Sequence, residues 1–226
     1  MTVYETAKAS VGIPKREVFR YLGYRGIAPD ETILGRVEEA VQKLQKESHP
    51  RSAWNVFPLE LSASSPDDIQ IGSLRFSSRQ LSRNLRGCSR VVLMAATIGP
   101  GADFLIRRSE AVSMLDAAIF QAAGAAMAES WCDEVNQRII AAMKEQGLFP
   151  RPRFSPGYGD VPLDLQKDFS ALLQMPQTCG ISLTDTLLMV PSKSVTAFIG
   201  FSEHKEPCIL AGCETCSHAA DCAFRR

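Results

Sequence analysis

Residues 90–99, RVVLMAATIG, restrict the fold more than any other stretch of the sequence. Apolar residues follow one another here, whereas a strand with one exposed face would alternate apolar and polar residues. An unbroken apolar run of strand length is typical of a strand that is covered on both faces. We therefore expect residues 90–99 to form a central, fully buried strand.

Residues 29–48, PDETILGRVEEAVQKLQKES, have the pattern of a surface helix. Apolar residues recur at the spacing of one helix face, and Asp30 stands where an N-cap belongs. The apolar positions are Ile33, Val37, Val41 and Leu44. We expect this helix to pack on a core through that face.

The remaining elements mix strands and helices without a regular βαβ alternation, which favours an α+β fold over a doubly wound sheet. The expected strands and helices cover residues 53–61, 69–76, 180–190 and 194–201, and residues 77–87, 110–146 and 163–173, respectively. Gly87 and Gly147 are the expected stops of two of these helices. The segment ATIGPGADF lacks the third glycine of a dinucleotide fingerprint, so we interpret it as a turn that starts a helix.

The composition excludes several classes of function. The chain has 226 residues, 45% of them hydrophobic, and its 25 basic residues balance 25 acidic residues. A protein that coats nucleic acid would carry a basic excess. No apolar run reaches membrane-spanning length, and the N-terminus lacks the apolar core of a signal peptide. We therefore expect a cytoplasmic protein that binds neither nucleic acid nor a membrane.

Four arginines recur at helical spacing, namely Arg79, Arg83, Arg86 and Arg90. At least the first three share one face of the predicted helix. They form either a docking surface for an acidic protein or for phosphates, or a solvated helix face with no further role.

Residues 153–163, RFSPGYGDVPL, place two prolines and two glycines in one short loop. Gly157 and Gly159 permit backbone conformations and close approaches that other residues do not, and the prolines stiffen the loop. Arg153 offers a planar fork for a carboxylate or phosphate, and Tyr158 offers a ring face and a hydroxyl. The loop is therefore either a small-molecule clamp with exposed backbone amides or a structural bend.

Three alanines and a glutamate lie on one stripe of the long predicted helix: Ala118, Ala122, Ala125 and Glu129. Small side chains allow another backbone or a ligand to come close. A lone buried carboxylate is costly, so Glu129 either faces solvent or meets a positive group.

Four of the seven cysteines crowd the end of the chain, in the spacing Cys208-x4-Cys213-x2-Cys216-x5-Cys222. In a reducing compartment this clustering indicates a metal before a disulfide. The four thiolates suit one zinc ion or an iron–sulfur cluster, and the alternative is a reduced tail without metal. We expect residues 204–226 to be a metal-binding tail that follows a domain at residues 1–203, whose helical N-terminal part covers residues 1–50.

Two stretches resemble the activation domain of cobalamin-dependent methionine synthase, and resemble the stand-alone members of that family more closely still. They are RFSPGYGDVPLDLQKDFSALL and GISLTDTLLMVPSKSVTAFIGF, and the similarity in order and spacing covers most of the chain after residue 90. The residues that match the family motifs are Arg153, Pro156, Gly157 and Tyr158, then Leu183, Thr184, Asp185 and Thr186, then Pro191, Ser194 and Val195.

The resemblance implies a twisted antiparallel sheet flanked by helices, in a domain that binds S-adenosylmethionine. Arg153 would meet the methionine carboxylate, and the backbone of Ser155, Pro156 and Gly157 would line the cofactor. Tyr158 would stand near the face of the cobalamin. An acidic residue of the long helix would meet the amino group of the ligand, and the matching residue is Glu129. The alanine stripe and the loop would then belong to one pocket.

The sequence departs from the family pattern at three points. The loop continues with Gly159 to Pro162 in place of a Pro-Ala-Cys-Pro turn. A cobalamin-carrying module and a barrel for homocysteine or folate are missing, and the cysteine tail has no counterpart in the family domain. The chain would therefore act on a corrinoid that a partner presents, such as a methionine synthase that lacks its own activation domain.

Two functions follow from the resemblance. One is a factor that binds S-adenosylmethionine and supports the reductive reactivation, by remethylation, of a corrinoid-dependent methyltransferase. The electron would come from a ferredoxin, a flavodoxin or an iron–sulfur cluster in the tail. The other is a non-catalytic module that binds S-adenosylmethionine or stabilises a corrinoid protein, with a structural zinc in its tail.

Overall fold

The computed structural model describes residues 3–7, 11–24, 26–62 and 64–205. Its strands are β1 (Val3–Thr6), β2 (Arg51–Leu61), β3 (Asp68–Ile71), β4 (Leu74–Ser77), β5 (Arg90–Thr97), β6 (Phe149–Pro150), β7 (Ser182–Leu183), β8 (Met189–Val190) and β9 (Ser194–Ser202). Within the described residues, seven strands form one sheet in the order β4-β3-β2-β5-β9-β6, with β1 paired to β2. Neighbouring strands of this sheet are antiparallel, which confirms the predicted α+β class.

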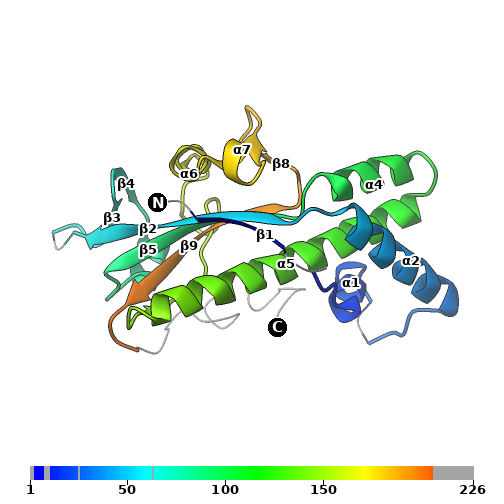
Figure 1. The fold of residues 1–226 in the computed structure, drawn as a ribbon, viewed down its shortest axis with the longest axis horizontal. Helices are drawn as coiled ribbons and strands as arrows, with labels where there is room; N and C mark the ends of the chain where they lie inside the picture. The colour runs from blue at the N-terminus through cyan, green and yellow to red at the C-terminus, as the bar shows by residue number, and fades with distance from the viewer. Residues whose placement is uncertain (1–2, 8–10, 25, 63, 206–226) are drawn as a thin grey trace.

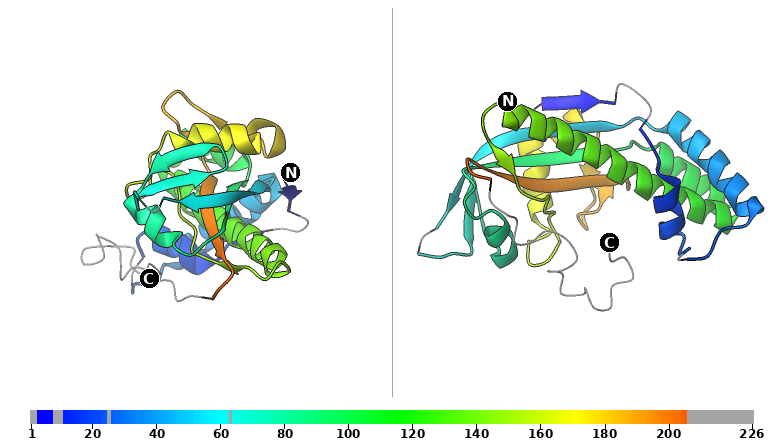
Figure 2. Two further views of the ribbon diagram at one scale, coloured as in Figure 1. Left: turned by 90° about the vertical axis from the view of Figure 1, so that its left-hand side faces the viewer. Right: turned by 90° about the horizontal axis from the view of Figure 1, so that it is seen from below.

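Helices lie on both faces of the sheet and beyond one end of it (Figures 1 and 2). They are α1 (Lys15–Tyr21), α2 (Glu31–Glu47), α3 (Arg79–Asn84), α4 (Gly101–Glu110), α5 (Met114–Lys144), α6 (Leu165–Leu173) and α7 (Met175–Thr178). The long helix α5 runs under one face, and α6 and α7 cover the other (Figure 1). Helices α2 and α4 pack against the part of α5 that extends beyond the end of the sheet.

Strand β5 is the central strand that the apolar run predicts. It pairs with β2 on one side and with β9 on the other. Val92, Met94 and Ala96 belong to the core under α5, whereas Val91, Leu93 and Ala95 belong to the core under α6. Both faces of β5 are therefore buried, which is why its sequence shows no polar alternation.

Helix α2 confirms the pattern that predicts it. The Asp30 carboxylate accepts a hydrogen bond of 2.8 Å from the Ile33 amide, as an N-cap should. The C-terminus of α2 also meets the start of α4 at Gly101, where an added Cβ would lie 2.1 Å from the carbonyl oxygen of Glu47. The first residue of α4 therefore has to be glycine for the two helices to pack this closely.

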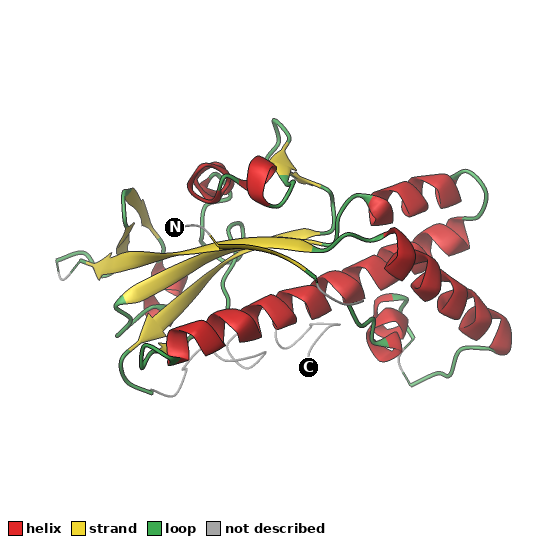
Figure 3. Cartoon of the chain, viewed as in Figure 1, coloured by secondary structure: helices red, strands yellow, loops and turns green. Residues whose placement is uncertain are grey.

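Four predicted elements differ from those observed (Figure 3). The strand expected over residues 69–76 is the hairpin of β3 and β4, and the helix expected over residues 77–87 is α3, which ends at Asn84. The helix expected over residues 110–146 is α5, which begins later, at Met114. It begins there because Ser113 caps a new helix by accepting a hydrogen bond of 3.3 Å from the Asp116 amide. The strand expected over residues 180–190 is a hairpin of β7 and β8, because the Thr184 amide donates to the Leu188 carbonyl and turns the chain back.

Among the helices that the structure describes, none combines the length and the apolar character that a membrane-spanning helix needs.

Candidate functional site

The loop that begins after β6 is fastened along β9 by backbone hydrogen bonds. The Arg151 amide donates to the Gly200 carbonyl at 2.7 Å. Phe154 and Phe198 exchange two hydrogen bonds, of 2.9 and 2.7 Å. Arg153 therefore lies in a stretch of chain whose position is fixed by the sheet.

The same loop closes into a tight turn after Arg153. Gly157 and Gly159 have φ angles of 81° and 60°, in the left-handed region that favours glycine. The Gly157 amide donates to the Val161 carbonyl at 3.0 Å, and the Tyr158 amide donates to the Ser155 carbonyl at 3.1 Å. These two amides are engaged inside the loop, so the expectation of exposed backbone amides is wrong for them.

Asp160 joins this turn to the N-terminus of α3. Its carboxylate accepts hydrogen bonds from the Ser78 hydroxyl at 2.5 Å, from the Arg79 amide at 2.8 Å and from the Gln80 amide at 3.2 Å. Burial raises the pKa of the Asp160 carboxyl, but these hydrogen bonds outweigh burial, so the pKa lies below its usual value. This contact could not be predicted from the sequence, because no local pattern links an aspartate to a helix that precedes it by 80 residues.

Arg153 lies against two carboxylates of α5. Its Nη2 atom is 2.8 Å from Asp133 Oδ1 and 3.7 Å from Glu129 Oε2. The two acids are one helical turn apart, so both face the loop from the same side of α5. The structure thus brings together Arg153 and Glu129, the two charged residues singled out in the sequence, and adds Asp133. Its spacing of four residues from Glu129 is the signal that could have identified it.

The Arg153 side chain is only partly satisfied by these contacts. It is 24% exposed, and its Nη1 atom is buried without a hydrogen-bond partner among the described residues. A guanidinium with an unused donor beside two carboxylates offers both charges that the carboxylate and ammonium of an amino acid require.

Cys132 lies beneath these charges on α5. Burial raises the pKa of its thiol to about 12; Arg153 opposes this shift, and Glu129 and Asp133 add to it. Cys132 is therefore a protonated thiol at neutral pH and supplies no nucleophile to the site.

Tyr158 is 57% exposed at the tip of the turn. Its ring packs edge-on against Phe154, with the ring centroids 5.4 Å apart. The ring is thus oriented by the loop while much of its surface remains accessible.

The alanine stripe lines a hollow of about 450 Å³ between α1 and α5. The lining residues are Tyr21, Leu22, Ala118, Gln121, Ala122 and Ala125. A second hollow, of about 470 Å³, includes Asp133 and the segment Gly12–Pro14. Neither hollow is lined by Arg153 or Glu129, so the single pocket expected from the resemblance stays a prediction.

The other two family motifs have structural roles. Thr184 holds the turn between β7 and β8, because its hydroxyl accepts a hydrogen bond of 3.1 Å from the Leu188 amide. The Ser194 hydroxyl is 2.6 Å from the Pro191 carbonyl and 2.9 Å from the Thr97 hydroxyl, so it fixes the start of β9 beside the end of β5.

The cysteine tail lies outside the described residues, which end at residue 205. Among the residues that the structure describes, no group of three or more histidine, cysteine, aspartate or glutamate side chains is placed to hold a metal. The metal at Cys208, Cys213, Cys216 and Cys222 and the domain division after residue 203 therefore stay predictions.

Comparison with known proteins identifies a family and a fold. A family described as "Vitamin B12 dependent methionine synthase, activation domain" matches residues 93–208, half of the chain. A solved structure, "Crystal Structure of the MetH Reactivation Domain bound to AdoHcy", has the same fold with a TM-score of 0.64. It is 18% identical, and the alignment covers 91% of this chain and 80% of that one. A comparison with curated proteins found no match.

The matched region contains the elements that build the site. It begins within β5 and includes α5, the loop with Arg153, and both strands of the β7–β8 hairpin. The fold before residue 93 also agrees, since the solved reactivation domain aligns with 91% of this chain. The chain belongs to the family of vitamin B12-dependent methionine synthase activation domains.

Proposed function

We propose that this chain binds S-adenosylmethionine beside Arg153 and supports the reductive reactivation of a corrinoid-dependent methyltransferase. The observation that carries the proposal is the Arg153 guanidinium held against Glu129 and Asp133, in a loop that bears a family motif. Membership of the activation-domain family and the AdoHcy bound to the solved reactivation domain support the same ligand class.

The charges at the loop fit the amino-acid end of S-adenosylmethionine. The ligand carboxylate would take hydrogen bonds from the accessible part of the Arg153 side chain, which is 24% exposed. The ligand ammonium would pair with Glu129 or Asp133. Because both signs of charge are already present, binding would exchange ion pairs and would leave no charge unpaired.

The chain's part in the reaction would be to bind and orient the methyl donor. A partner's cobalt(II) corrinoid would take one electron from a ferredoxin or flavodoxin, and the resulting cobalt(I) would accept the methyl group while S-adenosylhomocysteine leaves. The loop would fix the amino-acid end of the donor, and holding the methyl group close to the partner would be the chain's main contribution to the rate. No side chain of the loop has to act as a nucleophile.

The Arg153→Ala variant should bind S-adenosylmethionine about tenfold to a hundredfold more weakly, since it loses a charge-assisted contact. Isothermal titration calorimetry on the wild type and the variant measures the change. Arg107→Ala is the matched control, because Arg107 is exposed on α4 and its replacement removes the same charge. Equal affinities of Arg153→Ala and the wild type, or no binding by the wild type, would contradict the proposal.

Turnover separates reactivation from simple binding. The protein is mixed with a corrinoid protein in the cobalt(II) state, a reductant and S-adenosylmethionine that carries a labelled methyl group. Label on the corrinoid only when the chain is present supports reactivation. If S-adenosylmethionine binds in the calorimeter but no label is transferred to the corrinoid, the result supports the second function, a non-catalytic binding module.

A further inference from the structure

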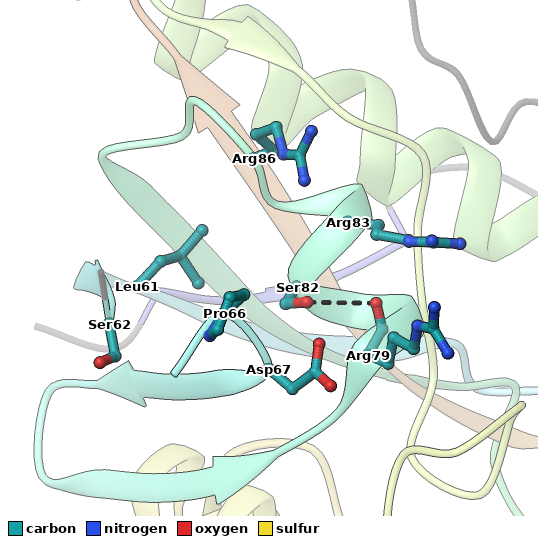
Figure 4. Close-up of a pocket in the computed structure, with 8 residues that line it drawn as sticks. All are labelled: Leu61, Ser62, Pro66, Asp67, Arg79, Ser82, Arg83 and Arg86. Atoms are coloured by element: carbon teal, nitrogen blue, oxygen red, sulfur yellow. Dashed lines mark hydrogen bonds between the residues drawn. The ribbon is translucent and has the colours of Figure 1, made fainter. Parts of the chain in front are cut away.

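Two arginines of α3, Arg79 and Arg83, and Arg86 in the turn that follows α3 line a hollow of about 470 Å³ on the surface (Figure 4). The hollow lies between α3 and the connection from β2 to β3. The other lining residues are Leu61, Ser62, Pro66, Asp67 and Ser82. We call this surface, formed by Arg79, Arg83 and Arg86 with those five residues, the basic groove.

The arginines of the basic groove carry charge that the described residues do not neutralise. Arg79, Arg83 and Arg86 are exposed, and none forms an ion pair with a carboxylate in the part of the chain that the structure describes. Asp67 lines the same groove. Asp160 is engaged in capping the helix. The groove therefore presents an excess of positive charge, although the chain as a whole is neutral.

Helix α3 holds these arginines on a rigid support. Leu81 and Leu85 are fully buried beneath the helix. The Ser78 hydroxyl caps the first turn of α3 by accepting a hydrogen bond from the Leu81 amide. The Asp160 carboxylate accepts hydrogen bonds from the Arg79 and Gln80 amides. A rigid row of charges loses little conformational entropy on binding beyond that of the side chains themselves.

The arrangement of the guanidinium groups identifies the shape of the partner. Arg79 and Arg83 extend to the same side of α3, and Arg86 lies in the turn that follows the helix (Figure 4). Arg79 and Arg83 are separated by about 6 Å along the helix axis, and Arg86 lies beyond them, so the three groups form an extended row that suits an elongated partner better than a single phosphate. Leu61 and Pro66 give the groove an apolar side. The net charge of zero disfavours a nucleic acid as the partner.

We propose that the basic groove docks an acidic segment of a partner protein. Carboxylates at positions i and i+4 of a helical segment match the spacing of Arg79 and Arg83 on α3, and a third carboxylate at i+7 would pair with Arg86 in the turn that follows. An apolar side chain between them enters the groove against Leu61 and Pro66. The proposal stands on the charge and shape of this surface and is independent of ligand binding at Arg153.

The test uses the full-length chain and a labelled synthetic helical peptide with Glu at i, i+4 and i+7 and one Leu between them. Fluorescence anisotropy should show binding that weakens as salt rises, because exposed charges are screened. Replacing the peptide's Glu residues by Gln, or its Leu by Ser, should each weaken binding. The triple variant R79Q/R83Q/R86Q should lose about tenfold in affinity, the combined effect of three exposed charge pairs.

The matched control is the triple variant R16Q/R107Q/R108Q, which removes three exposed arginines from other helices. Its affinity for the peptide should equal that of the wild type, and equal weakening in both variants would overturn the proposal. Absence of peptide binding would overturn it as well. Tighter binding of inorganic pyrophosphate, or of a single-stranded DNA of the same charge as the peptide, would show instead a small-anion or nucleic-acid site. Hydrogen exchange should show protection confined to α3 and residues 61–67.

Discussion

Asp160 connects two parts of the chain that are 81 residues apart. It satisfies the first amides of α3, which have no partner inside the helix. Gly159, next to it, allows the close approach, because an added Cβ would lie 2.2 Å from the Gln80 side-chain oxygen. A single carboxylate thereby fixes the loop of the candidate site and the helix of the basic groove relative to each other.

Replacing Asp160 by alanine should lower the free energy of unfolding by about 1 kcal/mol at neutral pH, the usual value of a helix cap. The pKa of this carboxyl is lower in the folded protein, so its contribution is present above the unfolded pKa and is lost as the pH falls through the folded one. The gap between wild type and variant should therefore narrow below about pH 4. Urea unfolding over a pH series measures it.

Asp164→Ala is the control for that series. Asp164 precedes α6 but makes no side-chain cap hydrogen bond, and it is exposed. Its replacement should change stability much less than the replacement of Asp160. Similar losses in the two variants would mean that the removed charge, and not the cap, is what matters.

The charged residues of the site were predictable from sequence to a limited extent. Arg153 and Glu129 stood out because each needs a partner, and the structure places them 3.7 Å apart. Asp133 makes the shorter contact and was missed, because an exposed acid on a helix is usually only solvated. Asp160 was missed for a different reason, since its partners come from a distant segment.

At the scale of elements, the meeting of α2 and α4 depends on one glycine. Gly101 opens α4 where the last turn of α2 passes, and an added Cβ would overlap the backbone of Glu47. Backbone atoms cannot move aside as a flexible side chain can. The angle between the two helices is therefore set by the absence of a side chain at this position.

The Gly101→Ala variant should be destabilised by about 1–3 kcal/mol, because the helices must separate to admit the methyl group. Gly35 supplies the matched control, since it lies within α2 with nothing within 4 Å of an added Cβ. Gly35→Ala should stabilise the protein by about 0.5–1 kcal/mol through helix propensity. Chemical denaturation of both variants decides the matter, and a neutral Gly101→Ala would show that the contact is loose.

Element prediction succeeded where burial produced a clear pattern and failed where a polar residue redirected the chain. The apolar run of β5 and the apolar face of α2 are consequences of packing, so they are visible in the sequence. The Ser113 cap and the Thr184 turn each depend on one hydroxyl. Such residues are common in exposed positions, and their effect becomes apparent only when the neighbouring helices and strands are in place.

At the scale of the whole molecule, the exposed ring of Tyr158 is the feature through which the site would meet a corrinoid protein. The Tyr158→Phe variant should keep its affinity for S-adenosylmethionine, because the hydroxyl is not needed for the charge pairing at Arg153. Methyl transfer to the corrinoid protein should be slower. Calorimetry and a transfer assay with labelled methyl groups measure the two effects separately. A large loss of affinity with normal transfer would show that Tyr158 serves the methyl donor.

Strand β5 contributes alternate residues to the two cores, and this makes the stability of one core depend on the other. The layer under α5 can lose the β5 side chains only if the strand moves; these side chains are Val92, Met94 and Ala96. The same movement withdraws the alternate side chains from the layer under α6, namely Val91, Leu93 and Ala95. Partial opening on one face therefore exposes apolar surface on both. We therefore expect the two layers to unfold as a single cooperative unit, even though the sheet separates them.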